Sequence, residues 1–339
     1  MRTPRGPRRS AALGSHRIYK TLDGEVLTMK LRRVAGAALG ALGVAAAANR
    51  VLTDAAGEYE PVLDADQGSY RWRGFDVAYA EAGDPEDPDV LLLHGVHAAA
   101  SNKEFQHVLD ALAEDHHVIA PDLPGFGGSD RPPLVYSASL YEAFVTEFAR
   151  EVTDDAVCIA TSLTGAYAAR VQEETGAFSR LVLVCPVADT GTRTTWLRTL
   201  LRTPLVGSAL FNAFTSKPVL RYYVGEEAFF DDRRFTTEDV DDYWRTAHQP
   251  GARFAPASFL SGFLDTDDDL GALLAELDVP VTLVWGRYAP DPDVDEGRAL
   301  AERADARLVV VERTRLFPHV EHPEPFLEAI EGELAVEAE

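Results

Sequence analysis

Ser162 is the residue of this chain best placed for nucleophilic chemistry. It follows the apolar run AVCIA (156–160), lies within TSLTG (161–165) and precedes an alanine-rich stretch of helical character. A sharp turn from a buried strand into a helix exposes a serine hydroxyl at the end of a sheet. That hydroxyl attacks a carbonyl carbon efficiently only when an adjacent base takes its proton. The first question is therefore whether the chain supplies such a base.

Histidine is the usual base at neutral pH, and an acidic residue usually orients it. The candidates for the base are His97, His248 and His319. The candidates for the acid follow predicted strands: Asp189, Asp291 and Asp293. Each has an ordinary alternative, since a histidine can line a pocket or cap a helix and an aspartate in so acidic a chain can simply face water.

Strand-like segments recur along the chain and must position these residues. Residues 69–73 and 75–82 alternate apolar and polar side chains around Gly74, which predicts a hairpin. Continuous apolar runs predict strands buried on both faces at 89–95, 117–123, 156–160, 180–185, 279–286 and 306–312. Helical patterns between them predict an α/β fold with a mostly parallel central sheet.

Residues 187–265 break this alternation. They contain no such strand but many helical patterns rich in aromatic residues, and they lie between two core strands. We interpret them as an inserted helical lid. The predicted organisation is an N-terminal segment (1–68), a core made of 69–186 and 266–335, and the lid.

Three motifs in chain order resemble the α/β-hydrolase fold. They are LLLHG (91–95), DLPGFGGSDRP (122–132) and WGR (285–287), with FPHVEHPEPF (317–326) near the end. Their order and spacing are similar to the lidded branch that includes esterases, epoxide hydrolases and haloalkane dehalogenases.

The resemblance implies that Ser162 stands at the nucleophile position. It places the two backbone donors of the oxyanion hole at Val96 and Leu163, with His94 beside them in the pocket. The flanking glycines of the usual G-x-S-x-G are replaced by Ala160 and Thr164, and the β-branched Thr164 is expected to strain the turn.

The same resemblance implies that the proton relay is missing. Ala289 stands where the family has its acid, and Leu316 stands where it has its histidine, immediately before Phe317-Pro318. In subtilisin, removal of the base alone costs on the order of 10⁶ in rate. His319, three residues further on, His97 and His248 are the possible substitutes, with Asp291 as a possible acid.

The leading functional hypothesis is a weakly catalytic or non-catalytic hydrolase relative that binds a small hydrophobic molecule. The alternative is an active serine hydrolase of esters or similar apolar substrates that uses Ser162 with a non-standard base. A third hypothesis is an interaction protein at a membrane surface. No cofactor is predicted, and no metal-binding spacing is present in the sequence. Oligomeric state is left open.

The net charge of the chain limits which kinds of molecule can be its partner. The 339 residues include 55 Asp and Glu against 32 Lys and Arg, for a formal net charge of -23. Such a surface repels phosphate backbones, which excludes nucleic acid as a partner. Lysine is scarce and aspartate abundant, a composition that resembles proteins of extremely halophilic archaea. Cys158 and Cys185 lie in apolar runs and are expected to be core residues.

The N-terminal segment differs from the rest. Its first 28 residues are basic, and Met29 opens a second basic start followed by small apolar residues from Val34 to Ala48. We expect translation to begin at Met29. The apolar run is shorter than the roughly 20 residues of a membrane-spanning helix. It predicts either a helix packed on the protein or peripheral membrane association. The protein is expected to be cytoplasmic, either free or held at a membrane through residues 34–48.

Overall fold

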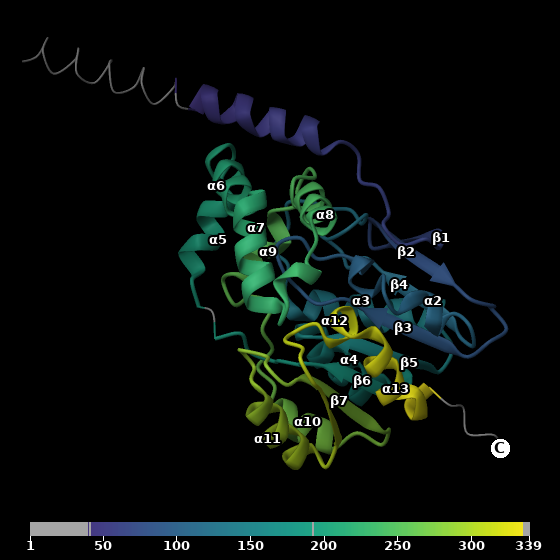
Figure 1. Cartoon of the computed structure of the whole chain (residues 1–339). Helices are drawn as coiled ribbons and strands as arrows, with labels where there is room; N and C mark the ends of the chain where they lie inside the picture. Colours follow the sequence, from purple (N-terminus) through teal and green to yellow (C-terminus); the bar gives the residue numbers. More distant parts are fainter. Residues whose placement is uncertain (1–39, 41, 192, 335–339) are drawn as a thin grey trace, which may run out of the picture. The chain divides into compact units, whose positions relative to one another are not determined.

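The computed structural model describes residues 40, 42–191 and 193–334 (Figure 1). The chain divides into a short unit that ends at Ala48 and a body that begins at Asn49, and a helix over residues 42–56 crosses that boundary. The expected start at Met29 and most of the apolar run from Val34 lie outside the described residues. Within them, no helix has the length and apolarity needed to cross a membrane.

A single sheet of eight strands forms the centre of the body. Its strand order is β1-β2-β4-β3-β5-β6-β7-β8; β1 pairs antiparallel with β2 and β2 with β4, whereas all the other pairs are parallel. The strands are β1 (Asp66–Trp72), β2 (Phe75–Ala82), β3 (Asp89–Leu93), β4 (His117–Pro121), β5 (Ala156–Thr161), β6 (Phe178–Val184), β7 (Val281–Gly286) and β8 (Arg307–Val311). The predicted mostly parallel sheet is therefore confirmed.

Successive residues of the parallel strands point to opposite faces, and both faces are buried. In β3, Leu91 and Leu93 join one apolar cluster while Val90 and Leu92 join the other. The first cluster is covered by α3 (Ala138–Val152), α4 (Leu163–Thr175) and α10 (Leu270–Ala275), with α11 (Val294–Ala304) beside β7 and β8. The second is covered by η1 (Asn102–Phe105), α2 (Leu109–Leu112), α12 (Pro318–Glu321) and α13 (Pro323–Leu334).

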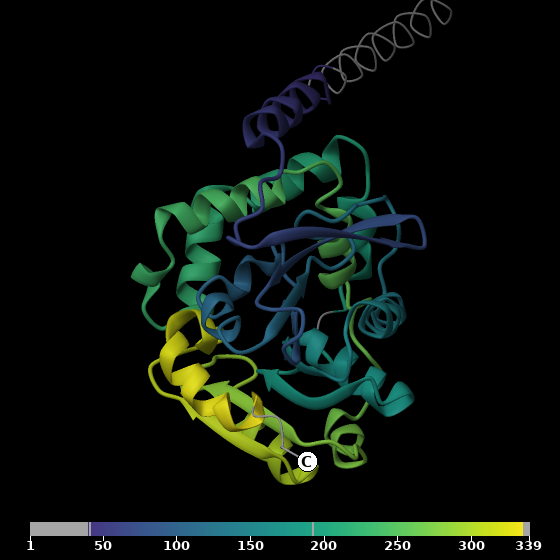
Figure 2. The same ribbon diagram turned by 90° about the vertical axis from the view of Figure 1, so that its right-hand side faces the viewer.

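A helical insertion, residues 195–259, lies between β6 and β7. It contains α5 (Thr195–Leu201), α6 (Val206–Phe214), α7 (Lys217–Tyr223), η2 (Val224–Ala228), η3 (Asp232–Arg234), α8 (Thr237–Ala247) and α9 (Phe254–Phe259). Its aromatic residues build a third apolar cluster that includes Phe211, Phe235 and Tyr243. The quarter turn of Figure 2 shows these helices at the same end of the body as in Figure 1.

Candidate active site

Ser162 occupies the turn between β5 and α4. Its backbone angles are φ 56° and ψ -128°, in a region that residues other than glycine rarely adopt. The Ser162 N–H donates to the carbonyl oxygen of Val184 at 2.9 Å, which fixes the turn to the end of β6. Strain of this kind persists only when the surroundings enforce it, and here it holds the serine at the carboxyl end of the sheet.

Thr164 fits the turn through its hydroxyl. The hydroxyl accepts the Thr161 N–H at 3.1 Å and lies 2.7 Å from the Thr161 carbonyl and 3.1 Å from that of Leu93, to which it can donate. The expected conflict between a β-branched side chain and close packing is thus relieved, because the side chain ties β3 to the turn. Gly165 is the residue that lacks space, since a Cβ there would lie 2.9 Å from Cβ of Pro186.

The loop after β3 is held by side chains beneath it. The Gly95 N–H donates to Oε2 of Glu104 at 2.9 Å. Nδ1 of His94 lies 2.7 Å from the Gly95 carbonyl, so it carries the proton, and its Nε2 accepts from the Leu123 N–H at 3.0 Å. Both ring nitrogens of His94 are thereby engaged in the loop, which makes it a support for the loop and not a proton acceptor for Ser162.

Glu104 forms a buried electrostatic pair with His319. Their side chains are 2% and 1% exposed, and Glu104 Oε1 lies 3.2 Å from His319 Nε2, at an angle outside hydrogen-bond geometry. Burial raises the pKa of the Glu104 carboxyl, but the adjacent His319 imidazole, the Thr161 hydroxyl and His94 outweigh it and hold the pKa below its ordinary value. The pair therefore places a carboxylate directly under the Gly95 amide.

A cavity of about 430 Å³ opens in front of Ser162, within the range of small-molecule sites. Its wall combines the loop after β3, the ends of β5 and β6, and η2 of the helical insertion. Apolar side chains dominate the wall, and they include Val96, Val187, Val224, Phe259, Leu316 and Phe317. A second cavity of about 180 Å³ shares His97, Tyr223, Val224 and Phe259 with it and extends between α6, α7 and α9.

His97 is the predicted base that shares the cavity with Ser162. Its ring stacks on Tyr243 at 5.3 Å, and its Nδ1 accepts the Ala99 N–H at 3.2 Å. Burial lowers the His97 pKa to about 4, against the attraction of Glu104, so the ring is neutral at pH 7. In this tautomer the proton is on Nε2, so the second ring nitrogen of His97 is a hydrogen-bond donor and not a basic lone pair.

His319 and His248 lie elsewhere. His319 is packed among Phe105, Phe317 and Phe326 beside Glu104, and it is not among the residues that line the cavity of Ser162. His248 stacks on Trp244, places Nδ1 2.8 Å from its carbonyl, and lines a different cavity beside residues 49–54.

Leu316 and Ala289, the positions that the family resemblance assigns to the relay histidine and acid, lie in different surroundings. Leu316 lines the cavity together with Phe317, whereas Ala289 is buried in the cluster around Trp285 and does not line it.

The candidate acids also differ in position. Asp291 and Asp189 line the cavity, but Asp189 pairs with Arg193 at 2.8 Å and Asp291 is exposed. Asp293 caps α11 through the amides of Asp295 and Glu296. Val96 lines the cavity, and Leu163 begins α4, where its N–H has no intrahelical acceptor.

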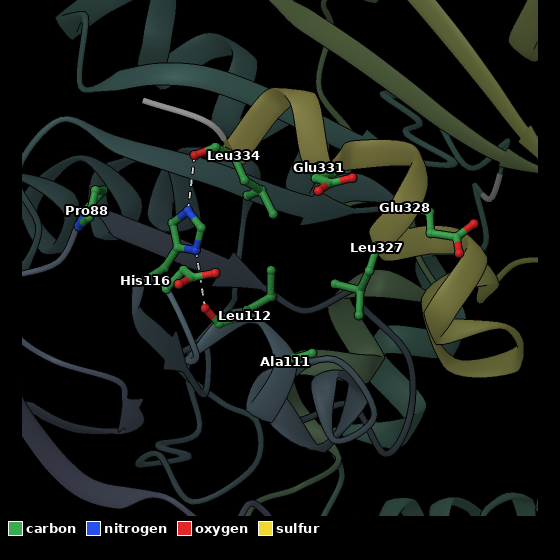
Figure 3. A pocket seen from close by; sticks show the side chains of 9 residues that line it. Pro88, Ala111, Leu112, His116, Leu327, Glu328, Glu331 and Leu334 are labelled. Carbon is green, nitrogen blue, oxygen red and sulfur yellow. Dashed lines mark hydrogen bonds between the residues drawn. The ribbon is translucent and has the colours of Figure 1, made fainter. Parts of the chain in front are cut away.

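A larger cavity, of about 550 Å³, lies at the amino-terminal ends of the central strands β3 and β4 (Figure 3). Pro88 and His116, which precede β3 and β4, line it with Leu112 and the end of α13. His116 spans it, with Nδ1 3.3 Å from the Leu112 carbonyl and Nε2 3.1 Å from that of Leu334. Ligands of open α/β sheets bind outside the carboxyl ends of the strands, which favours the smaller cavity as the functional site.

Two residues that matter here were missed by sequence reasoning. Glu104 carried no signal, because one buried acid among 55 acidic residues looks like any other. Lys103 did carry one, since lysine is rare in this chain; it is 5% exposed and pairs with Asp239 at 3.0 Å and Asp242 at 2.6 Å in α8. These ion pairs fasten the loop after β3 to the helical insertion. Among the described residues, no group of His, Cys, Asp and Glu is arranged to hold a metal.

Comparison with known proteins supplies the family. Residues 90–329 match the model described as "Alpha/beta hydrolase family". A 59-residue stretch is 46% identical to an uncharacterized hydrolase of Saccharomyces cerevisiae and covers 17% of this chain and 20% of that protein. A 69-residue stretch is 38% identical to epoxide hydrolase A of Mycobacterium tuberculosis and covers 20% and 21%. The matched stretches thus span about a fifth of these curated relatives.

The fold is similar to many solved structures. One of them is the Cif epoxide hydrolase from Acinetobacter nosocomialis, with a TM-score of 0.66 and 17% identity over 87% of this chain and 97% of that one. At this identity the likeness concerns the fold, and what the site does depends on its own residues.

Proposed function

Because the chain belongs to the alpha/beta hydrolase family, we propose that it keeps a family-type cavity for a small, neutral, apolar carbonyl compound but lacks the proton relay of a fast serine hydrolase. The observation that carries the proposal is the wall in front of Ser162. There Leu316, at the position that the family resemblance gives to the relay histidine, lines the cavity beside Phe317. Neither side chain accepts a proton, so the serine hydroxyl lacks activation from that side.

The distribution of donors supports a carbonyl ligand. His97 lines the cavity and carries its proton on Nε2, Val96 lines the same cavity, and the N–H of Leu163 follows Ser162 at the start of α4. A carbonyl oxygen accepts hydrogen bonds from such groups, while the hydrocarbon remainder of the molecule contacts Val224, Phe259 and the second cavity.

The charge of the cavity supports a neutral ligand. Asp189, Glu227 and Asp291 line it, and none of the described residues lining it is Lys or Arg. An anionic ligand would have to approach these carboxylates, of which Asp189 is paired with Arg193, and the repulsion costs free energy even where water screens the charges.

Three matched ligands test the proposal by isothermal titration calorimetry. We expect 2-octanone to bind about fivefold more tightly than its alkene isostere 2-methyl-1-octene, because the alkene lacks the acceptor. Octanoate is expected to bind more weakly than either. Leu316→Trp should abolish ketone binding by filling the cavity, whereas Leu327→Trp, at an equally half-buried leucine of the cavity in Figure 3, should not. Equal ketone affinity in the two variants would place the ligand elsewhere.

A second function, hydrolysis of apolar esters, has one observation in its favour. His97 shares the cavity with Ser162, and a rearrangement that released its Nδ1 from the Ala99 amide would free a lone pair. That hypothesis requires hydrolysis that depends on both Ser162 and His97, which calorimetry with ketones does not measure and ester kinetics does.

A further inference from the structure

The surface of the helical insertion departs from the charge of the rest of the chain. About one residue in six of the whole sequence is acidic, yet residues 190–225 contain no Asp or Glu. The same stretch contains five basic residues: Arg193, Arg198, Arg202, Lys217 and Arg221. It covers α5, α6 and α7, which lie side by side (Figure 1). Three neighbouring helices thus come from a stretch with five basic and no acidic residues, in a protein of net charge -23.

Large apolar side chains are exposed on the same helices. Half to two thirds of the surface of Trp196, Tyr222 and Tyr223 is accessible, at 66%, 59% and 53%. On α6, Val206, Leu210 and Phe214 follow one another at four-residue intervals, so they form one exposed stripe. The basic apolar face is our name for these exposed apolar residues and Leu205, together with the basic residues of the stretch 190–225. Monomeric proteins rarely leave such a patch without a partner.

Contacts between neighbouring groups make the face continuous. The Phe214 and Tyr223 rings are 6.1 Å apart, and Tyr223 packs edge-on against Tyr222 at 5.3 Å. Arg202 donates to the carbonyls of Pro133 and Leu134, which brings the exposed Leu134 to the end of α5.

Part of the positive charge lacks a carboxylate counter-ion. Arg202 and Arg221 donate to carbonyl oxygens, and Arg198 lies over the ring of Phe263 at 3.3 Å. Among the described ion pairs, those from this stretch start at Arg193 and Lys217. Nη1 of Arg198 is buried, so Arg202 and Arg221, whose partners are carbonyl oxygens, are the arginines that keep their charge available to an anionic partner.

We propose that the basic apolar face docks on the surface of an anionic lipid bilayer. Trp and Tyr beside Arg and Lys are the residues that membrane interfaces favour, since the rings enter the headgroup region while the cations meet lipid phosphates. A second copy of this chain fits poorly, because a symmetric contact would oppose the same positive charges. The face also leads inward, since Phe214 and Tyr223 line the cavity that adjoins the site of Ser162.

The start of the body lies beside this face. Asn49 follows the apolar run that ends at Ala48, and its side chain donates to the Leu205 carbonyl at 3.0 Å and accepts from Asn212 at 3.0 Å. These two hydrogen bonds hold the first residue of the body at α6 and the turn before it. The inference rests on the surface of the insertion and does not depend on the ligand of the cavity.

Sedimentation of the full chain with lipid vesicles tests the proposal. Vesicles of phosphatidylcholine mixed with phosphatidylglycerol should bind the protein, and molar KCl should weaken the binding without abolishing it, because salt screens only the ionic part. Phe214→Ser with Tyr222→Ser should lower binding about tenfold. The matched control, Phe230→Ser with Tyr288→Ser, changes two similarly exposed aromatic residues outside the face and should bind like the wild type. Arg221→Gln should cost roughly fivefold on anionic vesicles only.

Trp196 offers a second readout that does not depend on the variants. Of the four tryptophans, Trp72 and Trp285 are buried and Trp244 is half-buried, whereas Trp196 is 66% exposed. A blue shift and quenching by bromine-labelled lipid should therefore come mainly from Trp196, and most of both should be lost in Trp196→Phe. Residues 34–48 remain in every variant, so binding through them alone would leave Phe214→Ser with Tyr222→Ser unchanged and overturn the proposal. Absence of vesicle binding, with a dimer that the same variants dissociate, would overturn it too and assign the face to a protein partner.

Discussion

The two halves of the site around Ser162 depend on different parts of the chain, one on the backbone and the other on side chains. One half consists of the Ser162 turn and the loop at Gly95, where backbone angles and amides set the geometry. The other half is the wall at Leu316 and the segment at Ala289, where function depends on side-chain chemistry. The first half persists although Ala160 and Thr164 replace glycines, because Thr164 hydrogen-bonds within the turn.

Under the proposed function, the site has lost reactivity while its shape persists. A backbone amide survives almost any substitution at its own position, provided that the loop keeps its support. A proton relay is removed by a single substitution, since leucine and alanine have no group that exchanges a proton. A pocket of the same shape can therefore persist as a binding site after the relay is gone.

The largest expected effect breaks the backbone half. Glu104→Ala removes the acceptor of the Gly95 N–H and leaves His319 buried without its carboxylate. The free energy of unfolding should fall by about 3 to 5 kcal/mol, as for other buried pairs that lose one partner. Glu104→Gln keeps an acceptor and should lose less. Chemical unfolding measures both, and Glu302→Ala, at an exposed position of α11, is the control. Equal stability of Glu104→Ala and Glu302→Ala would contradict the supporting role of Glu104.

The next largest effect is expected when a histidine and an aspartate are introduced into the side-chain half. Leu316→His with Ala289→Asp should raise the rate of ester hydrolysis by on the order of 10²-fold, the lower end of the contribution of a general base. Ala289 is 6% exposed, so the aspartate alone would be buried without a partner, and Ala289→Asp as a single change should destabilise the fold without raising the rate. Initial rates with p-nitrophenyl butyrate measure the gain. A double variant as inactive as the wild type, though folded, would indicate that the Ser162 turn itself is unsuited to attack.

A smaller effect concerns His97 and the dependence of stability on pH. Its pKa is lowered to about 4, so between that value and the ordinary 6.5 the unfolded chain binds a proton that the folded protein does not. Stability should therefore fall as pH drops through this window, and His97→Asn should remove that part of the fall. His117 is the control of opposite sign, since burial opposes but Asp89 and Glu81 prevail in raising its pKa. Unfolding of His97→Asn and of a matched His117→Asn, measured at about pH 7 and about pH 5, should change in opposite directions relative to the wild type. Parallel changes in the two variants would contradict the assignment.

The smallest effect should act on both halves alike. At net charge -23 the surface repels itself when salt is dilute, so the thermal midpoint should be higher in molar KCl than in dilute buffer. The ratio of ketone to alkene affinity should stay the same, because the donors of the cavity are enclosed by protein. Equal midpoints in the two buffers would remove the halophilic interpretation of the composition.

The sheet could be predicted from sequence because each buried strand is a continuous apolar run, as in LLL (91–93) and LVLV (181–184). Ser162 could be placed at a strand-to-helix turn for the same reason. What sequence could not give was the contact of Glu104 with Gly95 and His319, since these residues are brought together only by the crossing of β3, η1 and α12. The sequence could not predict the tautomer of His97 either, because the nitrogen that carries the proton is set by the hydrogen bond from the Ala99 amide.

The histidine candidates show the same limit. Separation along the chain suggested His319 as a substitute for a histidine at Leu316, yet the turn of α12 directs it among Phe105 and Phe326, behind the loop. His248 lies in the insertion as expected, but in another cavity. Distance along a chain bounds where a side chain can reach, and packing decides where it points.

The dependence of ester hydrolysis on Ser162 tests the absence of the relay most directly. Wild type and Ser162→Ala are compared with p-nitrophenyl butyrate and with a fluorophosphonate that labels activated serines. We predict equal, near-background rates and no labelling of Ser162 in folded wild-type protein. Rapid hydrolysis by the wild type that Ser162→Ala abolishes, with stoichiometric labelling, would contradict the prediction, and loss of the same activity in His97→Asn would identify the base.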